Sequence, residues 1–163
     1  MNKIDRTQWV DFLNTTPSEE KPNWAIIGVG ITDKATDYNA NVTEEKWIIN
    51  KNATKTIEHY ALTSGVEQTA YKGDLVFEFI DDIRYHLKTG SDAETTLLEI
   101  DKYSVTEKDT TPKYRARLWN VGIEIGSNGG ETAKINYTIN YNGDPTFGTV
   151  TFENGVPTFT PQA

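Results

Sequence analysis

The stretch from Tyr137 to Pro161, YTINYNGDPTFGTVTFENGVPTFTP, carries the strongest structural signal in this chain. Its pairs Asn142-Gly143 and Asn154-Gly155 readily adopt the positive φ angles that tight β-hairpin turns require at both central positions. From residue 135 to 141, Ile and Tyr alternate with Asn and Thr, the pattern of a strand with one buried and one solvated face. The sequence therefore predicts an antiparallel β ribbon over residues 135–161, with hairpin turns at both Asn-Gly pairs.

The length of 163 residues suits one domain with a substantial core. We expect a single domain over residues 1–163, in which residues 1–23 form an N-terminal arm or lead-in. The sequence contains no cysteine, so we expect neither disulfides nor cysteine-ligated metal. Residues 1–13 lack the apolar run of a signal peptide, and no stretch reaches membrane-spanning length, so we expect a soluble protein without membrane insertion.

One segment follows helical periodicity instead. Between residues 74 and 89, apolar side chains recur at intervals of three and four, which places them on one face of a helix. Asp74 is a suitable N-cap and Gly90 a suitable C-terminal stop. We therefore predict an amphipathic helix over residues 74–89, packed on the flank of a β body. Its predicted core face consists of Leu75, Val76, Phe79, Ile80, Ile83 and Leu87.

The formal net charge of −8, from 24 acidic and 16 basic side chains, argues against a protein that grips nucleic acid through its phosphates. Two interpretations of the acidic balance remain. The charge either keeps the protein in solution, or it forms a surface that a polyanion must pass without binding.

Catalytic and cofactor signals are weak. His59 and His86 have no serine or cysteine arrangement that predicts a triad, and His86 lies four residues after Asp82, which suits a structural pair on a helix. Gly28 and Gly30 lack the third glycine of a dinucleotide-binding fingerprint. The sequence also has no carboxylates at metal-ligand spacing. We therefore expect no enzymatic activity, no cofactor and no structural metal.

Two long blocks of the sequence match a known family. One is GVEQTAYKGDLVFEFIDDIRYHLKTGSDAETT at residues 65–96, and the other is NYNGDPTFGTVTFENGVPTFTP at residues 140–161. Together with WAIIGVG at residues 24–30 and the stretch Tyr38–Glu44, they resemble the major tail tube protein of long-tailed, non-contractile (siphovirus-type) bacteriophages of Gram-positive bacteria. The resemblance covers most of the chain but not the first 20 residues.

The resemblance implies a mainly β (α+β) fold, an antiparallel β-sandwich or barrel of tail-tube type with one helix on its flank. It also implies a structural virion protein that assembles into stacked hexameric rings and forms a conduit for DNA. The expected partners are further copies of itself and the tape-measure, initiator and terminator proteins of the tail, while DNA passes without specific binding. The protein would be made in the host cytoplasm and end in the phage tail.

Two sets of residues are predicted to serve assembly. Residues 51–68 are predicted to form an intersubunit stacking element and not core, because Asn50–Thr56 is too polar to pack on an apolar face by itself. The predicted stacking residues are Lys51, Asn52, Thr54, Lys55, Glu58 and Tyr60. A lumen that carries DNA should hold more carboxylates than Lys or Arg, and the lumen candidates are Glu99, Asp101 and Glu124, each of which has outer solvent as its alternative.

Two other functions stay open, a carbohydrate- or receptor-binding β-sandwich module of the virion and a tail terminator or secretion-tube relative. Aromatic side chains gathered on one exposed concave face would favour sugar binding. Protruding loops and unpaired sheet edges would favour a tube.

Overall fold

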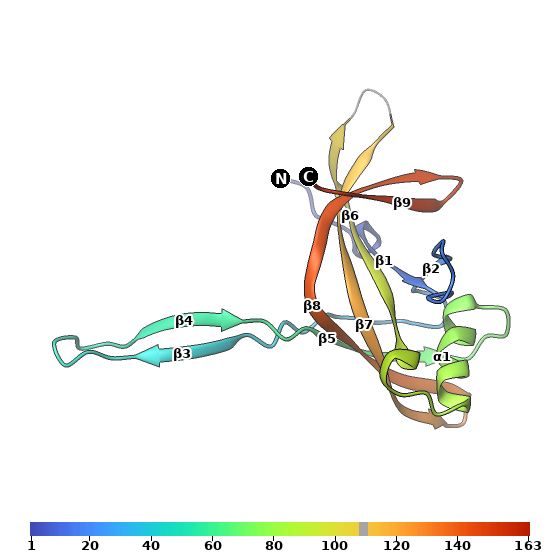
Figure 1. The fold of residues 1–163 in the computed structure, drawn as a ribbon, viewed down its shortest axis with the longest axis horizontal. Helices are drawn as coiled ribbons and strands as arrows, with labels where there is room; N and C mark the ends of the chain where they lie inside the picture. The colour runs from blue at the N-terminus through green and yellow to red at the C-terminus, as the bar shows by residue number, and fades with distance from the viewer. Residues whose placement is uncertain (108–110) are drawn as a thin grey trace.

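The computed structural model describes residues 1–107 and 111–163. Its main body is a seven-stranded antiparallel sheet that curves into a nearly closed barrel, with one α-helix on its flank and a two-stranded arm that projects from it (Figure 1). The strands of the main sheet are β1 (Trp9–Asn14), β2 (Trp24–Ile26), β5 (Thr63–Thr69), β6 (Glu94–Glu107), β7 (Lys113–Gly129), β8 (Lys134–Glu153) and β9 (Val156–Pro161). The arm consists of β3 (Asn41–Glu45) and β4 (Thr54–His59). The helix is α1 (Leu75–Tyr85), and short 3-10 turns occupy Arg6–Gln8 and Gly90–Ala93.

The strand order in the main sheet is β2-β1-β6-β7-β8-β5, and β9 pairs with β8. All of these pairings are antiparallel. The architecture confirms the expected mainly β fold class with one flanking helix. No helix within the described residues is both long and apolar enough to cross a bilayer.

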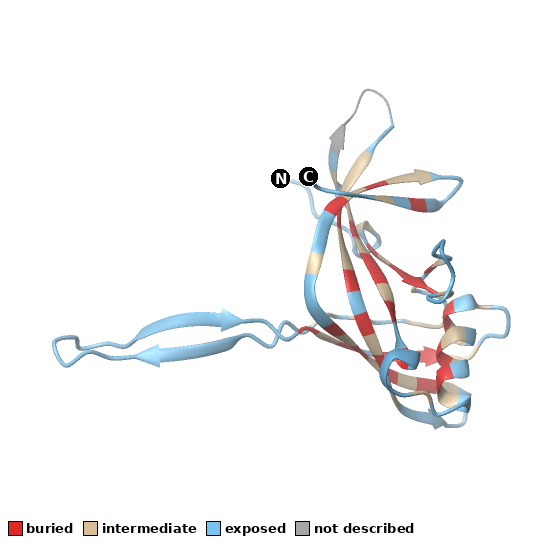
Figure 2. Cartoon of the chain, in the orientation of Figure 1, coloured by how far each residue is buried: buried red, intermediate tan, exposed pale blue. Residues whose placement is uncertain are grey.

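Two apolar cores lie on opposite faces of the curved sheet, because successive strand residues point to opposite sides. In β6, Leu97 enters the larger core under α1, whereas its neighbour Leu98 enters the smaller core. The smaller core is covered by the β8–β9 hairpin, from which Phe152 and Phe159 pack inward. Figure 2 shows the buried residues gathered on the sheet and on the sheet-facing side of α1.

The helix begins where it is predicted to begin. The Asp74 carboxylate accepts a hydrogen bond from the Phe77 N–H at 2.9 Å, as an N-cap should. The helix ends at Tyr85, four residues before the predicted end. Leu87 adopts a left-handed φ of 51°, and the Lys88 N–H bonds back to the Ile83 carbonyl at 3.0 Å, so the chain closes in a Schellman-type turn without glycine.

The early end of α1 changes its predicted core face. Val76, Ile80 and Ile83 are fully buried, and Phe79 is half-buried against the same core. Leu75 and Leu87 are 46% and 83% exposed, so their assignment to the core was wrong. Leu75 occupies the first helical position, and Leu87 lies beyond the last helical turn.

The prediction of a lead-in over residues 1–23 was also wrong in part. Residues Trp9–Asn14 form β1, which pairs with both β2 and β6 inside the main sheet. Val10 and Phe12 enter the smaller core, and Leu13 enters the larger one. Four of its six residues are apolar, but the strand is short and is flanked by polar residues on both sides, so it was missed.

The two Asn-Gly pairs have different structures. Asn154 and Gly155 both have positive φ, 51° and 78°, and join β8 to β9 in the predicted two-residue hairpin. The hairpin predicted at Asn142-Gly143 is absent, and β8 continues through these residues.

The continuous path of β8 follows from the length of its partner. Strand β7 spans 17 residues and pairs with β8 on both sides of the Asn-Gly pair, at Asn142 and again at Thr146. Because only Trp119 separates the partners of those two residues, the stretch from 143 to 145 bulges out of the ladder. Gly143 supports this bulge with a φ of 66°.

Candidate assembly surfaces

The arm is a hairpin that lies outside both cores. All residues from 37 to 61 are exposed, and Figure 2 shows the whole arm as solvent-facing. An isolated two-stranded hairpin is at best marginally stable in water. Its Val42 and Ile57, which face each other across β3 and β4, are 47% and 56% exposed. The arm therefore offers backbone and apolar surface to another molecule.

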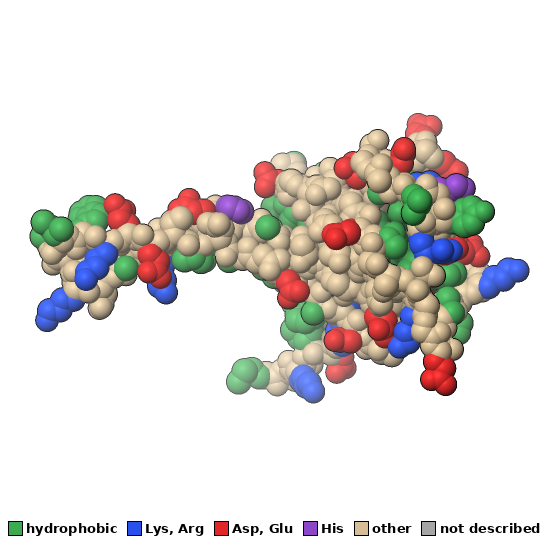
Figure 3. All heavy atoms as spheres, turned by 90° about the horizontal axis from the view of Figure 1, so that it is seen from below, with side chains coloured by type: hydrophobic (Ala, Val, Ile, Leu, Met, Phe, Trp, Pro, Cys, Tyr) green, Lys and Arg blue, Asp and Glu red, His purple; other side chains and the backbone are tan. Residues whose placement is uncertain are grey.

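The tip of the arm, which we define as residues 46–51, is apolar at its centre and basic on both sides. A turn closes it through the Asn50 N–H, which donates to the Trp47 carbonyl at 3.0 Å. Trp47, Ile48 and Ile49 follow one another and are 61%, 104% and 80% exposed. Lys46 and Lys51 flank them, and Figure 3 shows hydrophobic and basic side chains together at the outer end of the arm. Three consecutive exposed apolar residues indicate a binding surface.

The predicted stacking residues are spread along the arm. Lys51 is the last residue of the tip, Asn52 follows it, and Thr54, Lys55 and Glu58 lie on β4. On the arm, Lys55 pairs with Glu44 at 3.0 Å, and Glu58 accepts a hydrogen bond from the Thr43 hydroxyl at 2.7 Å.

Tyr60 lies at the root of the arm, where its ring packs edge-on against Tyr38 at 5.9 Å. The predicted exclusion of residues 51–68 from the core was wrong for β5. Ser64 and Gln68 are fully buried in the main sheet, and Val66 is 4% exposed. Alternate polar residues concealed this strand in the sequence.

A cavity of about 710 Å³ opens at the root of the arm. Its lining includes five aromatic side chains, which come from the arm root, from β7 and from β8: Tyr38, Tyr60, Trp119, Tyr141 and Phe147. The rings of Trp119 and Tyr141 meet edge-on at 5.2 Å, and Phe147 is 58% exposed. Cavities of roughly 300–1,000 Å³ are the usual size for a ligand-binding pocket. We call this space the root cavity.

The β8 bulge forms one wall of the root cavity. Gly143, Asp144 and Pro145 all line it, and Asp144 has no ion-pair partner within the described part of the chain. Glu58 adds a second carboxylate from β4. The Tyr141 hydroxyl is buried near Thr36 and Glu99 without a hydrogen bond of good geometry, and burial raises its pKa well above the ordinary value.

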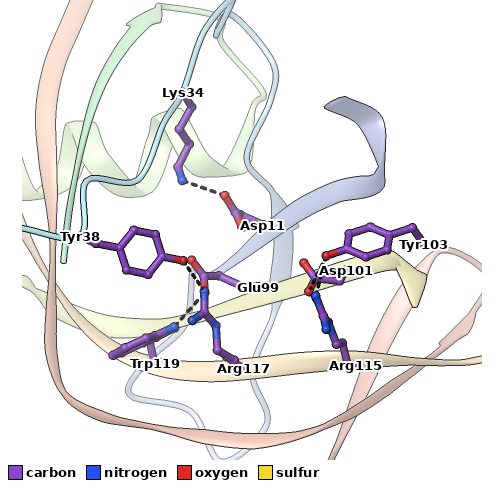
Figure 4. Close-up of polar contacts among 9 residues, drawn as sticks. All are labelled: Asp11, Lys34, Tyr38, Glu99, Asp101, Tyr103, Arg115, Arg117 and Trp119. Carbon is purple, nitrogen blue, oxygen red and sulfur yellow. Dashed lines mark hydrogen bonds and ion pairs between the residues drawn. The ribbon is translucent and has the colours of Figure 1, made fainter. Parts of the chain in front are cut away.

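A polar network fixes the root of the arm to the sheet (Figure 4). The Glu99 carboxylate accepts from the Trp119 indole N–H at 2.9 Å and pairs with Arg117 at 2.7 Å. Arg117 also donates to the Tyr38 hydroxyl at 3.1 Å. This chain of contacts joins β6, β7 and the arm root.

Burial dominates the electrostatics of Glu99. It raises the pKa of the Glu99 carboxyl, the Asp11 charge adds to the rise, and Arg117 opposes it. Nearby, Lys34 and Asp11 form a 2.7 Å ion pair whose side chains are only 5% and 15% exposed (Figure 4). Removal of one partner from such a buried pair strongly destabilises the folded protein, because the other charge stays buried without a partner.

The three lumen candidates do not share one face. Glu99 and Asp101 lie opposite Arg117 and Arg115 on β7, on the face that also carries the larger core. Asp101 is paired with Arg115 at 2.5 Å. Glu124 points to the other face of β7, where the Asn140 amide donates to its carboxylate at 3.0 Å. One tube wall therefore cannot hold all three.

The face around Glu124 is almost free of apolar side chains. We define the polar face as the residues that point away from α1 on β5 and on the parts of β6, β7 and β8 nearest to it: Thr63, Gly65, Glu67, Thr69, Glu94, Thr96, Asn120, Gly122, Glu124, Lys134, Asn136, Thr138 and Asn140. Farther along the same side of the sheet, Leu98 and Ala116 belong to the smaller core and are not part of this face. Lys134, the lysine of this face, forms an ion pair with Glu67 at 2.7 Å. The polar face therefore has a net negative charge.

Asp82 of α1 is paired with two basic side chains that follow the helix. His86 lies 2.9 Å from Asp82, and Lys88 contacts the same carboxylate at 2.5 Å. The hydrogen bond from Lys88 lowers the pKa of Asp82, and His86 adds to this effect. Within the described ranges, no three His, Asp or Glu side chains are arranged to hold a metal ion.

Sequence reasoning missed the root cavity. Its aromatic residues lie far apart in the chain and carry no local pattern that would join them. The available signal was Asn-Gly-Asp-Pro at residues 142–145, which was interpreted as a hairpin turn.

No protein-family model and no curated protein matches this sequence. Among solved structures, the chain is similar to a protein from the tail of an empty gene transfer agent (GTA) particle, refined helically with C6 symmetry. The match has a TM-score of 0.55 at 10% identity and covers 89% of this chain and 98% of the other. At this identity the similarity shows a shared fold.

Proposed function

We propose that this chain is a structural tail-tube protein of a virus particle, of the siphovirus type, which polymerises as stacked hexameric rings around a passage for DNA. The observation that carries the proposal is the shared fold with a protein from a C6-symmetric tail, over 98% of that protein. A β body with open edges at β2 and β5 is suited to this role, since pairing across subunits would protect the edges.

The arm supports the same proposal. A long exposed hairpin that contributes to neither core has no role in the folding of the body, so its function lies in contact with other molecules. In a ring stack, the arm reaches from one subunit to the next. The other partners would be the tape-measure, initiator and terminator proteins of the tail, and no enzymatic step is involved.

We assign the polar face to the inner wall of the tube. The carboxylates of this face outnumber its lysine, Lys134, which is already paired with Glu67, so the face repels phosphates. Its Asn, Thr and Gly residues add no cation that could hold DNA. This assignment keeps Glu124 as a lumen residue and moves Glu99 and Asp101, which are paired with arginines, away from the lumen.

The proposal is tested by removing the end of the arm. Glu45 and Thr54 are paired across β3 and β4, so replacing residues 46–53 by Asn-Gly closes the hairpin with a two-residue turn. We expect the variant to keep the melting temperature of the wild type within about 3 °C, because no core residue is lost. Negative-stain microscopy and sedimentation over a wide concentration range should show rings or tubes for the wild type and only small species for the variant.

The matched control is Lys21→Gln, an exposed change in the lead-in between β1 and β2, which should assemble normally. A wild type that forms only two-fold dimers under every condition, with or without tail initiator proteins, would contradict the proposal, since rings need head-to-tail contacts.

The second candidate is a carbohydrate-binding module, which the aromatic lining of the root cavity favours. Aromatic faces at a concave site are suited to stacking on sugar rings. Isothermal titration with N-acetylglucosamine oligomers distinguishes the two: saturable binding without any assembly would favour the module.

A further inference from the structure

We propose that the arm tip of one copy inserts into the root cavity of a second copy, so that Trp47-Ile48-Ile49 fills the aromatic pocket and the flanking lysines meet its acidic rim. This inference rests on the proposed function, because it names the acceptor for the arm in the assembled tube. The two surfaces belong to the same chain and are complementary in polarity and charge.

The apolar match is the first argument. The tip exposes three consecutive apolar side chains, and the root cavity presents aromatic rings from Tyr38, Phe147 and Trp119. The volume of about 710 Å³ is in the range of pockets that enclose a drug-sized ligand. A cavity of this size can accept the side chain of Trp47 together with those of Ile48 and Ile49. Both surfaces leave water when they meet, and burial of apolar area is the main driving force of such contacts.

The charge match is the second argument. The tip, residues 46–51, carries Lys46 and Lys51 and no carboxylate, so it has a net positive charge, and the carboxylate that adjoins it in sequence is Glu45. The cavity carries Asp144 and Glu58 at exposed positions. The cavity's Arg117 is already paired with Glu99, so it leaves the net charge of the rim negative. Opposite charges around an apolar centre fix the register of the contact.

The arm cannot fill its own cavity, so the occupant that we propose is a second copy. Strand β4 alone spans roughly 20 Å at about 3.3 Å per residue, and it leads away from the cavity that its own root helps to form. Figure 1 shows the tip far from the body to which the arm belongs. Because tip and cavity are different surfaces, the contact is head-to-tail and can propagate into a ring or a stack.

The absence of cysteine from the sequence allows a direct test. Equal amounts of an Ile48→Cys variant and a Phe147→Cys variant are mixed, assembled and oxidised mildly, and the disulfide-linked peptides are identified by mass spectrometry. Both positions are exposed, so neither change should affect folding. We expect a link between residues 48 and 147 in most of the Ile48→Cys subunits whose neighbour is a Phe147→Cys subunit. A matched mixture of Ile48→Cys with Thr138→Cys, on the polar face, should give less than a tenth of that yield.

Charge reversal gives an independent readout. Lys51→Glu or Asp144→Lys alone should raise the concentration needed for assembly about tenfold, as the loss of a close charge pair predicts. The double variant, in which the charges are exchanged, should return to within about threefold of the wild type.

The outcomes separate this inference from the proposed function. Two results would overturn the tip-in-cavity contact but not the proposed tube. In the first, tubes assemble but residue 48 links to a position other than 147. In the second, the double variant assembles as poorly as the single variants. A 48–147 link in open oligomers without rings would support the contact and contradict the hexameric tube. If N-acetylglucosamine oligomers saturate the root cavity and no 48–147 link forms, the cavity is a sugar site and the inference fails.

Discussion

At the scale of single residues, Gln68 shows how the larger core tolerates a polar side chain. It has no exposure to solvent, and its amide N–H groups donate to the Val29 carbonyl at 3.0 Å and to the Asp74 carboxylate at 2.8 Å. Its amide oxygen accepts from the Tyr137 hydroxyl at 3.1 Å. One side chain therefore joins β5 and β8 to the N-terminal cap of α1.

Replacing Gln68 by Ala should lower the free energy of unfolding by about 1–3 kcal/mol, because the Val29 carbonyl and the Tyr137 hydroxyl lose buried hydrogen-bond partners. Urea denaturation measures this change. The control is Glu67→Ala at the next position of β5, where the side chain is exposed and its ion pair with Lys134 contributes little. An equal effect for the two variants would show that the Gln68 network does not stabilise the fold.

Glu99 predicts a specific dependence of stability on pH. Because burial raises its pKa above 4.5, the folded state favours the protonated carboxyl. The contribution of Glu99 to stability is therefore largest below that pH and is lost as the pH rises through the raised pKa. A Glu99→Gln variant lacks this loss, so its stability relative to the wild type should increase between pH 4.5 and pH 7.

The free energies of unfolding of the Glu99→Gln variant and of the wild type are measured by urea denaturation across this pH range. The difference between the two free energies removes the contribution of the groups that titrate alike in both proteins. The matched control is Glu67→Gln, whose carboxylate is exposed and ion-paired on the polar face. A pH-independent difference between Glu99→Gln and the wild type would contradict the role assigned to burial.

At the scale of elements, the sequence correctly predicted those features that neighbouring residues determine. The alternation of residues 135–141, the Asp74 cap and the Asn154-Gly155 turn are each set by neighbouring residues, and each is present. The Asn142-Gly143 turn failed because a long partner strand decides whether β8 reverses, and that partner is distant in sequence. Strand β1 was missed for the same reason, since it gains its stability from β2 and β6.

The helix offers a test at this scale. Ile80 is fully buried under α1, so Ile80→Ala should lower the free energy of unfolding by about 2–5 kcal/mol through lost burial and a residual cavity. Leu87→Ala should change it by less than about 0.5 kcal/mol, because that side chain is 83% exposed. Thermal unfolding of the two variants tests the observed core face against the predicted core face. The predicted face included both Ile80 and Leu87, so it would require a large loss of stability for both variants.

At the scale of the whole molecule, the sequence predicted the kind of surfaces but not their positions. It predicted a stacking element over residues 51–68, whereas the exposed arm is formed by β3 and β4, and β5 belongs to the main sheet. The separation of Glu124 from Glu99 and Asp101 depends on strand register between β6 and β7, and the root cavity depends on three separate parts of the chain. Such features arise from tertiary pairing, which one sequence does not display.

The last prediction concerns the charge of the inner wall. If the polar face lines the passage, replacing Glu94 and Glu124 by Lys places unpaired cations along the path of the DNA in every subunit. Each cation adds a counterion-release term to DNA binding, so we expect ejection from particles built with the double variant to slow by about tenfold or more at low salt. The delay should shrink as salt is raised, because screening weakens the same term.

Ejection is measured as release of genome from purified particles after addition of receptor. The matched control is Glu19→Lys with Glu20→Lys in the exposed lead-in, which changes the net charge of the chain equally but lies outside the polar face. Equal delays for the two variants would assign the effect to overall charge. If particles with Glu94→Lys and Glu124→Lys assemble normally and eject DNA at an unchanged rate, the polar face lies on the outside of the tube. Cations that line the passage would bind the phosphates and slow the DNA.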